Sequence, residues 1–465
     1  MFRPKKQEAQ QTLWVPTSEI VQTPVNRFYD RLDRELEKAG FHDRVRALCR
    51  AYYSDGGPGR LGIDPVVYFK MLMVGFFECI ASERAIAARC ADSLSIRHFL
   101  RYELTEATPH HSSMTRIRQR LPEEVYGEVF ALILSALKKA KLVKGKKLGV
   151  DASVIEANAS MRALTHRLSG EAYRDYVKQL AGEAGVDPND EAAVTRFDRK
   201  RKKRVSNDEF THPHDPDAKV TRTKKGQTRM GYKPEHTVDL ETGAIVDVDL
   251  RPGDEHDTVD LTDRMIEAEE RMNVSLGLEK DDATIEVLVA DKGYYKTEEL
   301  AALQEAGIKT VIPEKATERN LEKLCPAHRR AVRAARRSTQ AKYGRALLRK
   351  RGELLERSFQ HVLDCGGARR TTLRGRGNVI KRYLIQAACA NLSLLMRTLC
   401  GIGTPKQAMA AAAGLLATII ALLQHLYRPS TLHHALETGQ SQYIRPNPFI
   451  ISRHHPIVLS VESKC

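Results

Sequence analysis

Two aspartates stand where short apolar runs meet polar sequence. Asp151 lies inside KKLGVDASVI, and Asp291 ends the run VLVAD. An ionised carboxylate beside buried strands is costly unless a cation compensates it, so such acids are usually paired or bound to a metal. If the two strands are neighbours in one sheet, both carboxylates reach the same edge of that sheet. The alternative for Asp291 is a cap on the helix that KTEELAALQEAG predicts.

A third acid from a nearby helix would complete an oxygen-rich site. The stretch GELLERSFQHVLD predicts a helix that carries Glu353 and Glu356, one turn apart. Hard divalent cations such as Mg²⁺ or Mn²⁺ prefer carboxylate ligands. Two such ions, roughly 3.5–4 Å apart, clamp the attacking and leaving oxygens of an in-line phosphoryl displacement. The acids therefore predict a phosphoryl-transfer site that holds two ions.

The net charge predicts a polyanionic partner. Lys and Arg number 75 against 59 Asp and Glu, which leaves a formal charge of +16 and a pI near 9.4. Nucleic acid is a frequent partner of a chain this basic, with solubility or an anionic membrane as alternatives. Basic residues concentrate at 199–204 and between 329 and 351, where the alternative is a solvated surface. The candidates for phosphate contacts are Arg199, Lys200, Arg201, Lys202, Lys203, Arg204, Arg333, Arg336 and Arg337.

Cysteine usage and the apolar segments favour a cytoplasmic protein that does not enter a membrane. The eight cysteines form no CxxC pair, and their spacing predicts neither a disulfide framework nor a zinc site. The first residues, MFRPKKQEAQQTLW, lack the apolar region of a signal peptide. Residues 408–423 carry no charge, but they fall short of the roughly 20 residues that span a bilayer. We expect them to form a buried or partner-packed helix.

Residues 25–142 predict a helical domain after an N-terminal arm at 1–24. VNRFYDRLDRELEKAG has helical periodicity, DPVVYFKMLMVGFFECI predicts an apolar helix, and shorter helices follow up to HHSSMTRIRQRL. Short helices joined by tight turns suit a helix-turn-helix, and an ordinary helical bundle is the alternative. The candidate base or groove contacts are Arg97, Arg101, Arg116 and Arg118.

Residues 143–400 predict a mixed α/β core. GYKPEHTVDL and GAIVDVDLR form a predicted hairpin, and IEVLVAD and IKTVIP are predicted strands that alternate with helices. A polar insertion occupies 156–229, and a basic segment occupies 315–351. An apolar helix and an irregular tail are expected at 401–465.

At the acidic positions the sequence resembles the DDE transposases of bacterial insertion sequences. The matching motifs are VDASVIEANAS around Asp151, VLVADKGYY around Asp291 and LLERSF around Glu356. GYKPEHTVDLETGAIVDVDLRPGDEHD is similar to the second and third strands of that family, and RGRGNVIKRYLIQAACANLSLL to its closing helix. The segment around 25–135 is similar to the helical domain often fused to this core, so the resemblance spans most of residues 25–395.

The resemblance implies an RNase H-like fold and metal-dependent cleavage and joining of DNA at transposon ends. It assigns Asp151, Asp291 and Glu356 as catalytic metal ligands, with Glu353 as the alternative third acid. A branch of the family has an Arg four residues before its Glu and a Lys seven after. Around Glu356 these positions hold Gly352 and Leu363, whereas Glu353 has Arg349 but Gln360.

The resemblance implies that the partner is double-stranded DNA, namely the terminal inverted repeats of a transposon and the target DNA. It also implies that the chain forms a homodimer or a larger assembly on DNA. The place of action would be the bacterial nucleoid. His236, His256 and Asp257 are possible supporting residues, although a sheet histidine and a helix start explain them equally well. A structure-selective nuclease and a non-catalytic DNA-binding protein are the alternative functions.

Overall fold

The computed structural model describes residues 24–53, 62–201, 206–223, 226–279, 284–315 and 321–426. The chain divides into two units, Met1–Ala408 and Met409–Cys465. The predicted arm before residue 24 and the predicted tail beyond residue 426 lie outside the described residues.

The N-terminal part of the chain is helical, as predicted. Its third helix, α3, is buried along almost its whole length and supplies the centre of this region. Asp64 caps α3 by accepting a hydrogen bond from Val66 N, and Pro65 occupies the first turn. The helices are α1 (Pro24–Lys38), α2 (Phe41–Cys49), α3 (Pro65–Phe77), α4 (Glu83–Asp92), α5 (Leu94–Leu100), α6 (His111–Arg120) and α7 (Glu123–Lys139).

A mixed sheet follows, and its strand order confirms the predicted fold class. Strand β6 pairs antiparallel with β7 on one side and with β1 on the other, whereas β1, β8 and β9 run parallel. Two antiparallel pairings followed by parallel strands are the arrangement expected of an RNase H-like core. The strands are β1 (Lys147–Ala152), β2 (Ile155–Glu156), β5 (Lys219–Arg222), β6 (Thr228–Asp239), β7 (Ile245–Pro252), β8 (Val287–Val289) and β9 (Lys309–Val311).

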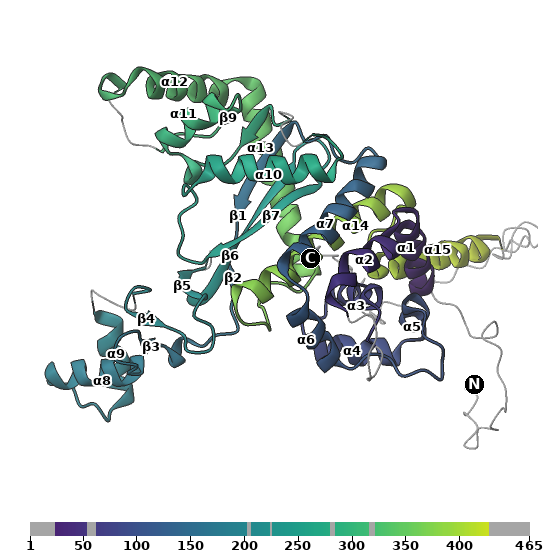
Figure 1. Ribbon diagram of the computed structural model, residues 1–465, viewed down its shortest axis with the longest axis horizontal. Coiled ribbons are helices and arrows are strands. Elements are labelled where there is room, and N and C mark those ends of the chain that lie inside the picture. The colour runs from purple at the N-terminus through teal and green to yellow at the C-terminus, as the bar shows by residue number, and fades with distance from the viewer. Residues whose placement is uncertain are drawn as a thin grey trace, which may run out of the picture. The chain divides into compact units, whose positions relative to one another are not determined.

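Helices cover both faces of the sheet, and neighbouring residues of β6 identify which helix covers which face. His236 contacts Ser358 of α13 (Lys342–Phe359) and Tyr383 of α14 (Arg376–Cys400). Glu235 points to the opposite face, where it pairs with Arg264 of α10 (Leu261–Ser275). Helix α14 also packs along α7, so it joins the helical region to the sheet (Figure 1).

Two further helices extend the core beside β9. They are α11 (Thr297–Glu305) and α12 (Pro326–Gln340), and α12 buries Ala331, Val332 and Ala335. The other side of α12 carries arginines. The helix therefore presents an apolar face to the core and a cationic face to solvent.

The insertion between β2 and β5 has a small apolar cluster of its own. It contains β3 (Thr165–His166), α8 (Tyr173–Glu183), α9 (Glu191–Lys200) and β4 (Phe210–Thr211), and Val177, Ala181 and Val194 form its buried centre. Its last segment is tied to the core, because Asp215 accepts hydrogen bonds from Tyr232 Oη and Gly375 N. The insertion is thus anchored at the start of α14.

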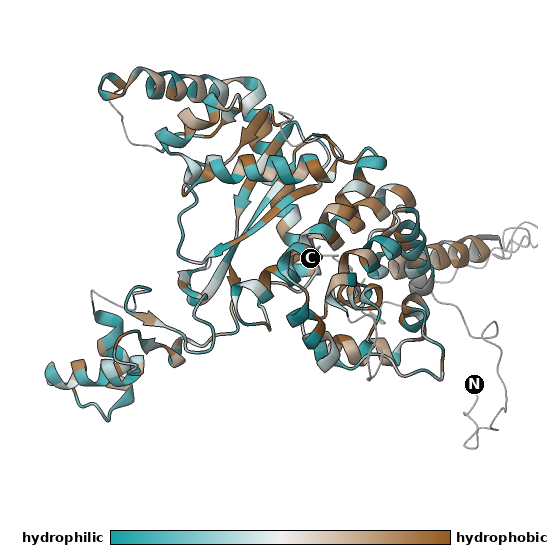
Figure 2. Cartoon of the chain, in the orientation of Figure 1, coloured by the Kyte–Doolittle hydropathy of each residue, from teal (hydrophilic) through white to brown (hydrophobic). Residues whose placement is uncertain are grey.

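Helix α15 (Pro405–Leu426) is apolar over most of its length and appears predominantly brown in Figure 2. Large apolar side chains, including Leu415, Leu416 and Leu422, are exposed on it. Within the described part of the chain, the stretch Arg376–Leu423 is the one helical segment long and apolar enough to cross a membrane by length and composition alone.

Asn391 is expected to be essential for the stability of the sheet edge. Its buried amide accepts a hydrogen bond from Ile245 N (2.9 Å) and donates one to Ile245 O (2.8 Å), which continues the ladder of β7 onto α14. Asn391→Leu leaves both backbone groups without partners, so we expect a loss of about 2–4 kcal/mol of unfolding free energy. Chemical denaturation measures it. Thr398→Ala, on the exposed side of α14, is the control and should change stability by less than about 0.5 kcal/mol. Equal effects of the two variants would contradict this role.

Candidate active site

The parallel pairing of β1 and β8 brings Asp151 and Asp291 to one edge of the sheet. Leu148 is opposite Leu288 and Gly149 is opposite Val289. Continuing this register by two residues would bring Asp151, near the end of β1, opposite Asp291, two residues beyond the end of β8. The sequence-based expectation that the two strands are neighbours is therefore met by the strand order.

Asp151 faces helix α13 and is paired with a cation of that helix. Its partner across the antiparallel ladder is His236, so both side chains point to the α13 face. Arg351 Nη2 lies 2.9 Å from Asp151 Oδ1, and the same oxygen accepts a hydrogen bond from Ala152 N at 2.9 Å. The Arg351 side chain is 11% exposed and that of Asp151 is 19% exposed. The Asp151 carboxylate is thus fixed by a backbone hydrogen bond, its negative charge is balanced by Arg351, and it remains partly exposed to solvent.

Asp291 is held by the turn that follows β8. Its Oδ1 accepts a hydrogen bond from Gly293 N at 2.7 Å, within the 3-10 turn Lys292–Tyr294. Asp291 is the N-cap of this 3-10 turn, whereas the N-cap of α11 is Lys296, so the capping alternative holds for the turn and not for α11. A Cβ atom on Gly293 would lie 2.8 Å from Asp291 Oδ1 and 3.2 Å from Asp257 Oδ2. The two carboxylates therefore flank Gly293, and the turn requires a residue without a side chain.

Of the three possible supporting residues, Asp257 lies on the other side of Gly293 from Asp291. Its Oδ1 lies 2.6 Å from Lys233 Nζ and 3.2 Å from Arg251 Nη2. His256, its neighbour in sequence, is exposed, and its backbone oxygen accepts a hydrogen bond from Arg251.

A buried carboxylate that the sequence analysis missed, Glu235, lies behind Asp257. It pairs with Arg251 (2.9 Å) and Arg264 (2.8 Å) and accepts a hydrogen bond from Tyr294 Oη (2.7 Å). Burial raises the pKa of Glu235, and the two arginines oppose that shift. Burial, together with Glu235, raises the pKa of Tyr294 well above its usual value. The available signal was an acid inside a buried strand, the same signal that singled out Asp151.

The third acid is not gathered with the other two. Glu356 and Glu353 are both exposed on α13, and Glu353 pairs with Arg357 at 2.6 Å. Among the residues whose placement is described, no three His, Cys, Asp or Glu side chains are close enough together to hold a metal ion. Glu356 follows the buried Leu355, on the helix that covers Asp151. The oxygen ligands present fit a hard divalent cation, but the strands position only two of them.

His236 is a satisfied core histidine rather than a group facing this site. Its Nδ1 is 2.9 Å from Ser358 Oγ and its Nε2 is 2.8 Å from Tyr383 Oη. The ring stacks on Phe359 with centroids 4.1 Å apart. Burial lowers the pKa of His236 to about 3, which keeps the imidazole neutral.

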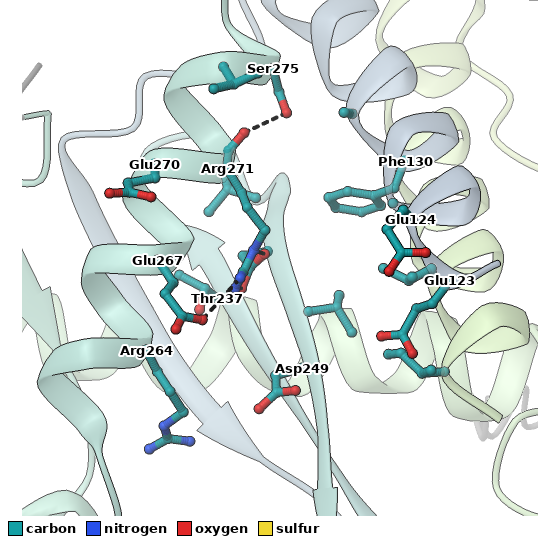
Figure 3. Close-up of a pocket in the computed structure, with 18 of the residues that line it drawn as sticks. Glu123, Glu124, Phe130, Thr237, Asp249, Arg264, Glu267, Glu270, Arg271 and Ser275 are labelled. Atoms are coloured by element: carbon teal, nitrogen blue, oxygen red, sulfur yellow. Dashed lines mark hydrogen bonds and ion pairs between the residues drawn. The ribbon is translucent and has the colours of Figure 1, made fainter. Parts of the chain in front are cut away.

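A cleft on the opposite face of the sheet is acidic. It has a volume of about 570 Å³ and is lined by residues of α7, β6, β7, α10 and α14. Figure 3 shows Glu123 and Glu124 of α7 across from Arg264 and Glu267 of α10, with Asp249 between them. Because most of its charged lining is negative, this cleft is not suited to a DNA backbone.

Most of the arginines proposed for the helical region have partners inside the protein. Arg97 is buried and donates to the backbone oxygens of Leu104 (3.2 Å) and Glu106 (2.6 Å). Arg118 is buried against Glu83 and donates to Asn378 Oδ1 at 3.2 Å. The guanidinium groups of Arg97 and Arg118 are therefore engaged inside the protein and do not face a DNA surface.

The two remaining arginines of that set differ in exposure and pairing. Arg101 forms ion pairs with Asp33 and Glu37 of α1. Arg116 is exposed on α6. Arg116 is consequently the member of the set best placed to reach a ligand.

The basic segments of the core are similarly divided. On α12, Arg333 and Arg337 are exposed, whereas Arg336 pairs with Glu314 at 2.7 Å. In the insertion, Arg199 and Lys200 are exposed at the end of α9, and Arg201 pairs with Asp198 at 2.9 Å. The remaining candidates, Lys202, Lys203 and Arg204, lie outside the described residues.

Comparisons with known proteins identify two segments of the chain. A family model described as a transposase domain (DUF772) matches residues 19–120. A second model, described as a transposase DDE domain, matches residues 202–392. The second segment includes Asp291 and both candidate glutamates, and Asp151 falls between the two segments. No curated protein and no solved structure matches the chain.

The buried imidazole of His236 predicts acid sensitivity. Its folded pKa of about 3 lies below its ordinary value of 6.5, so the unfolded state binds the extra proton. Its contribution to stability is complete above about pH 6.5 and is lost as the pH falls toward 3, by about 1.4 kcal/mol per pH unit. His236→Gln should flatten the fall in unfolding free energy between pH 6.5 and 4, measured by chemical denaturation. The exposed His256→Gln is the control, and a similar flattening in both variants would refute the assignment.

Proposed function

The chain belongs to the DDE-type transposases of insertion sequences, and on that premise we propose that it cuts DNA at transposon ends and joins the freed 3′-OH to target DNA. Members of this family act on DNA and use divalent metal ions. The observation that carries the proposal is the pair of carboxylates, Asp151 and Asp291, at the ends of adjacent parallel strands of an RNase H-like sheet.

Asp151 and Asp291 would hold two divalent ions, Mg²⁺ or Mn²⁺, with Glu356 as the third ligand and Glu353 as the alternative. When bound, such ions lower the pKa of a water and stabilise charge on phosphoryl oxygens. The protein's own contribution is preorganisation. The backbone N–H groups of Ala152 and Gly293 fix one oxygen of each aspartate, so the carboxylates are oriented before the substrate arrives.

The cationic face of α12 would hold the DNA backbone. Arg330, Arg333 and Arg337 are exposed and lie three and four residues apart, which aligns them along one side of the helix. Arg199 and Lys200 of the insertion, with the run that follows them, are further candidates. These contacts position DNA without reading its sequence.

The helical region would read the transposon end, with Arg116 as its exposed candidate for a base or groove contact. A transposon has two ends, so we propose a homodimer or larger assembly on DNA. The proposed substrates are the terminal inverted repeats and double-stranded target DNA.

The acids are tested by substitution. Asp151→Asn and Asp291→Asn keep the shape of the side chain but remove its charge. We expect DNA affinity to persist and cleavage to fall by at least about a hundredfold, because the ligand is lost. The substrate is a duplex that carries the inverted repeats flanking the coding sequence, incubated with Mg²⁺. Cleavage and strand transfer are scored separately, so a product that is cut but never joined identifies a nuclease instead.

The third acid is decided by a matched pair of variants. Glu356→Gln should abolish cleavage in the same assay, whereas Glu353→Gln should retain it, because Glu353 is an exposed residue paired with Arg357. The reverse result would transfer the role to Glu353. Near wild-type cleavage by both variants would show that neither glutamate is the third ligand.

The salt dependence of DNA binding tests the α12 contacts. Replacing Arg333 and Arg337 together with Ala should reduce the log–log salt slope by up to about 1.8, since each phosphate contact contributes about 0.9 on duplex DNA. Arg336→Ala on the same helix is the matched control, because its side chain pairs with Glu314. Fluorescence anisotropy with a random duplex at several salt concentrations measures the slope. An unchanged salt slope in the double variant would show that these side chains are solvated and do not contact phosphates.

A further inference from the structure

Arg351 connects α13 to the end of β1 through two kinds of contact. Its Nε and Nη2 donate to the backbone oxygen of Val150, at 3.2 and 2.9 Å. Its Nη2 also lies 2.9 Å from Asp151 Oδ1. One buried guanidinium therefore binds the backbone of the strand and the carboxylate that follows it.

The two kinds of contact have different consequences. The hydrogen bonds to Val150 O hold the guanidinium in place whether or not Asp151 is charged or occupied by another ligand. The positive charge consequently stays beside the carboxylate and does not leave with a simple rotation of the side chain. It compensates the repulsion between Asp151 and its neighbour Asp291 in the absence of metal. When a dication approaches Asp151, the same charge repels it.

We propose that Arg351 is a positioning residue that holds Asp151 in the metal-free protein and weakens its binding of divalent cations. This inference rests on the proposed role of Asp151 as a metal ligand. Arg351 would keep the acidic pair charge-compensated until an ion replaces the arginine as the partner of Asp151 Oδ1. The guanidinium then remains bound to Val150 O.

The test is a titration of the full-length protein with Mn²⁺, in which electron paramagnetic resonance measures the free ion. Arg351→Gln retains a donor for Val150 O but removes the charge. We expect it to bind Mn²⁺ on the order of tenfold more tightly, as Coulomb's law gives for a unit charge a few ångströms from a dication even in a water-like medium. Arg351→Lys keeps the charge and should stay within about threefold of the wild type. Arg336→Gln, which breaks an ion pair on α12, is the control and should leave Mn²⁺ affinity unchanged.

A second measurement separates this role from a purely structural one. Without metal, Arg351→Gln should unfold at a lower denaturant concentration than the wild type, because Asp151 loses its partner. Saturating Mn²⁺ should shrink that difference, since the tighter-binding variant gains more from the ion. A merely structural arginine would give the same difference with and without Mn²⁺.

The outcomes distinguish the inference from the function on which it rests. If Asp151→Asn and Asp291→Asn bind Mn²⁺ as the wild type does, the proposed metal site is wrong. If those variants lose binding but Arg351→Gln binds Mn²⁺ no more tightly than wild type, the metal site stands and this inference is overturned. Should Arg351→Gln fail to fold, Arg351→Met, which keeps the aliphatic stem, takes its place. Failure of both to fold would also overturn the inference, because Arg351 would then serve the fold alone.

Discussion

The parallel pairing of β1 and β8 is the constraint on which the rest of this core depends, because both strands lead into an aspartate at the same edge of the sheet. Continuing the register of β1 and β8 by two residues would bring Asp151 opposite Asp291, and like charges at that edge would oppose the pairing of the two strands. Hydrogen-bond donors and a guanidinium of the surrounding protein stabilise the negative charges of the two aspartates. Ala152 N donates a hydrogen bond to Asp151, and Arg351 forms an ion pair with it. Gly293 N donates a hydrogen bond to Asp291. Both carboxylates are thus held in place by groups of the protein itself.

The opposite face of the sheet carries a buried carboxylate, Glu235, that belongs to a separate network of ion pairs. Glu235 pairs with Arg251 and Arg264, and Arg251 extends the network to Asp257. Buried ion pairs contribute little net stability, because desolvation cancels much of the attraction, but breaking one leaves an uncompensated charge. The network would therefore be disrupted by the loss of any one of its charges. It links β6, the end of β7 and the start of α10 to the turn that carries Asp291.

Charge is distributed unevenly over a chain that is basic as a whole. The cleft between α7 and α10 is mainly acidic, whereas the exposed side of α12 is cationic. A polyanion is accordingly repelled from the α10 face and attracted to α12. Other arginines are paired inside the protein: Arg97 donates hydrogen bonds to backbone carbonyl oxygens, and Arg118 forms an ion pair with a glutamate. The net charge alone overstates how many cations are available to DNA.

The sequence by itself determined the local elements and the position of the two aspartates within them. Apolar runs and helical periodicity reflect short-range burial, so they located the helical region, the hairpin of β6 and β7, and the strands that carry Asp151 and Asp291. Only the tertiary structure decided which charges meet. Val150 and Arg351 are 201 residues apart, and no spacing rule links such positions. The same reason applies to Glu235, whose partners come from β7, α10 and the turn after β8. It also applies to Arg97 and Arg118, which the sequence predicted as DNA contacts and which are buried in the fold. Pairing across a fold depends on how distant elements pack, and a single sequence contains that information only through the folded chain.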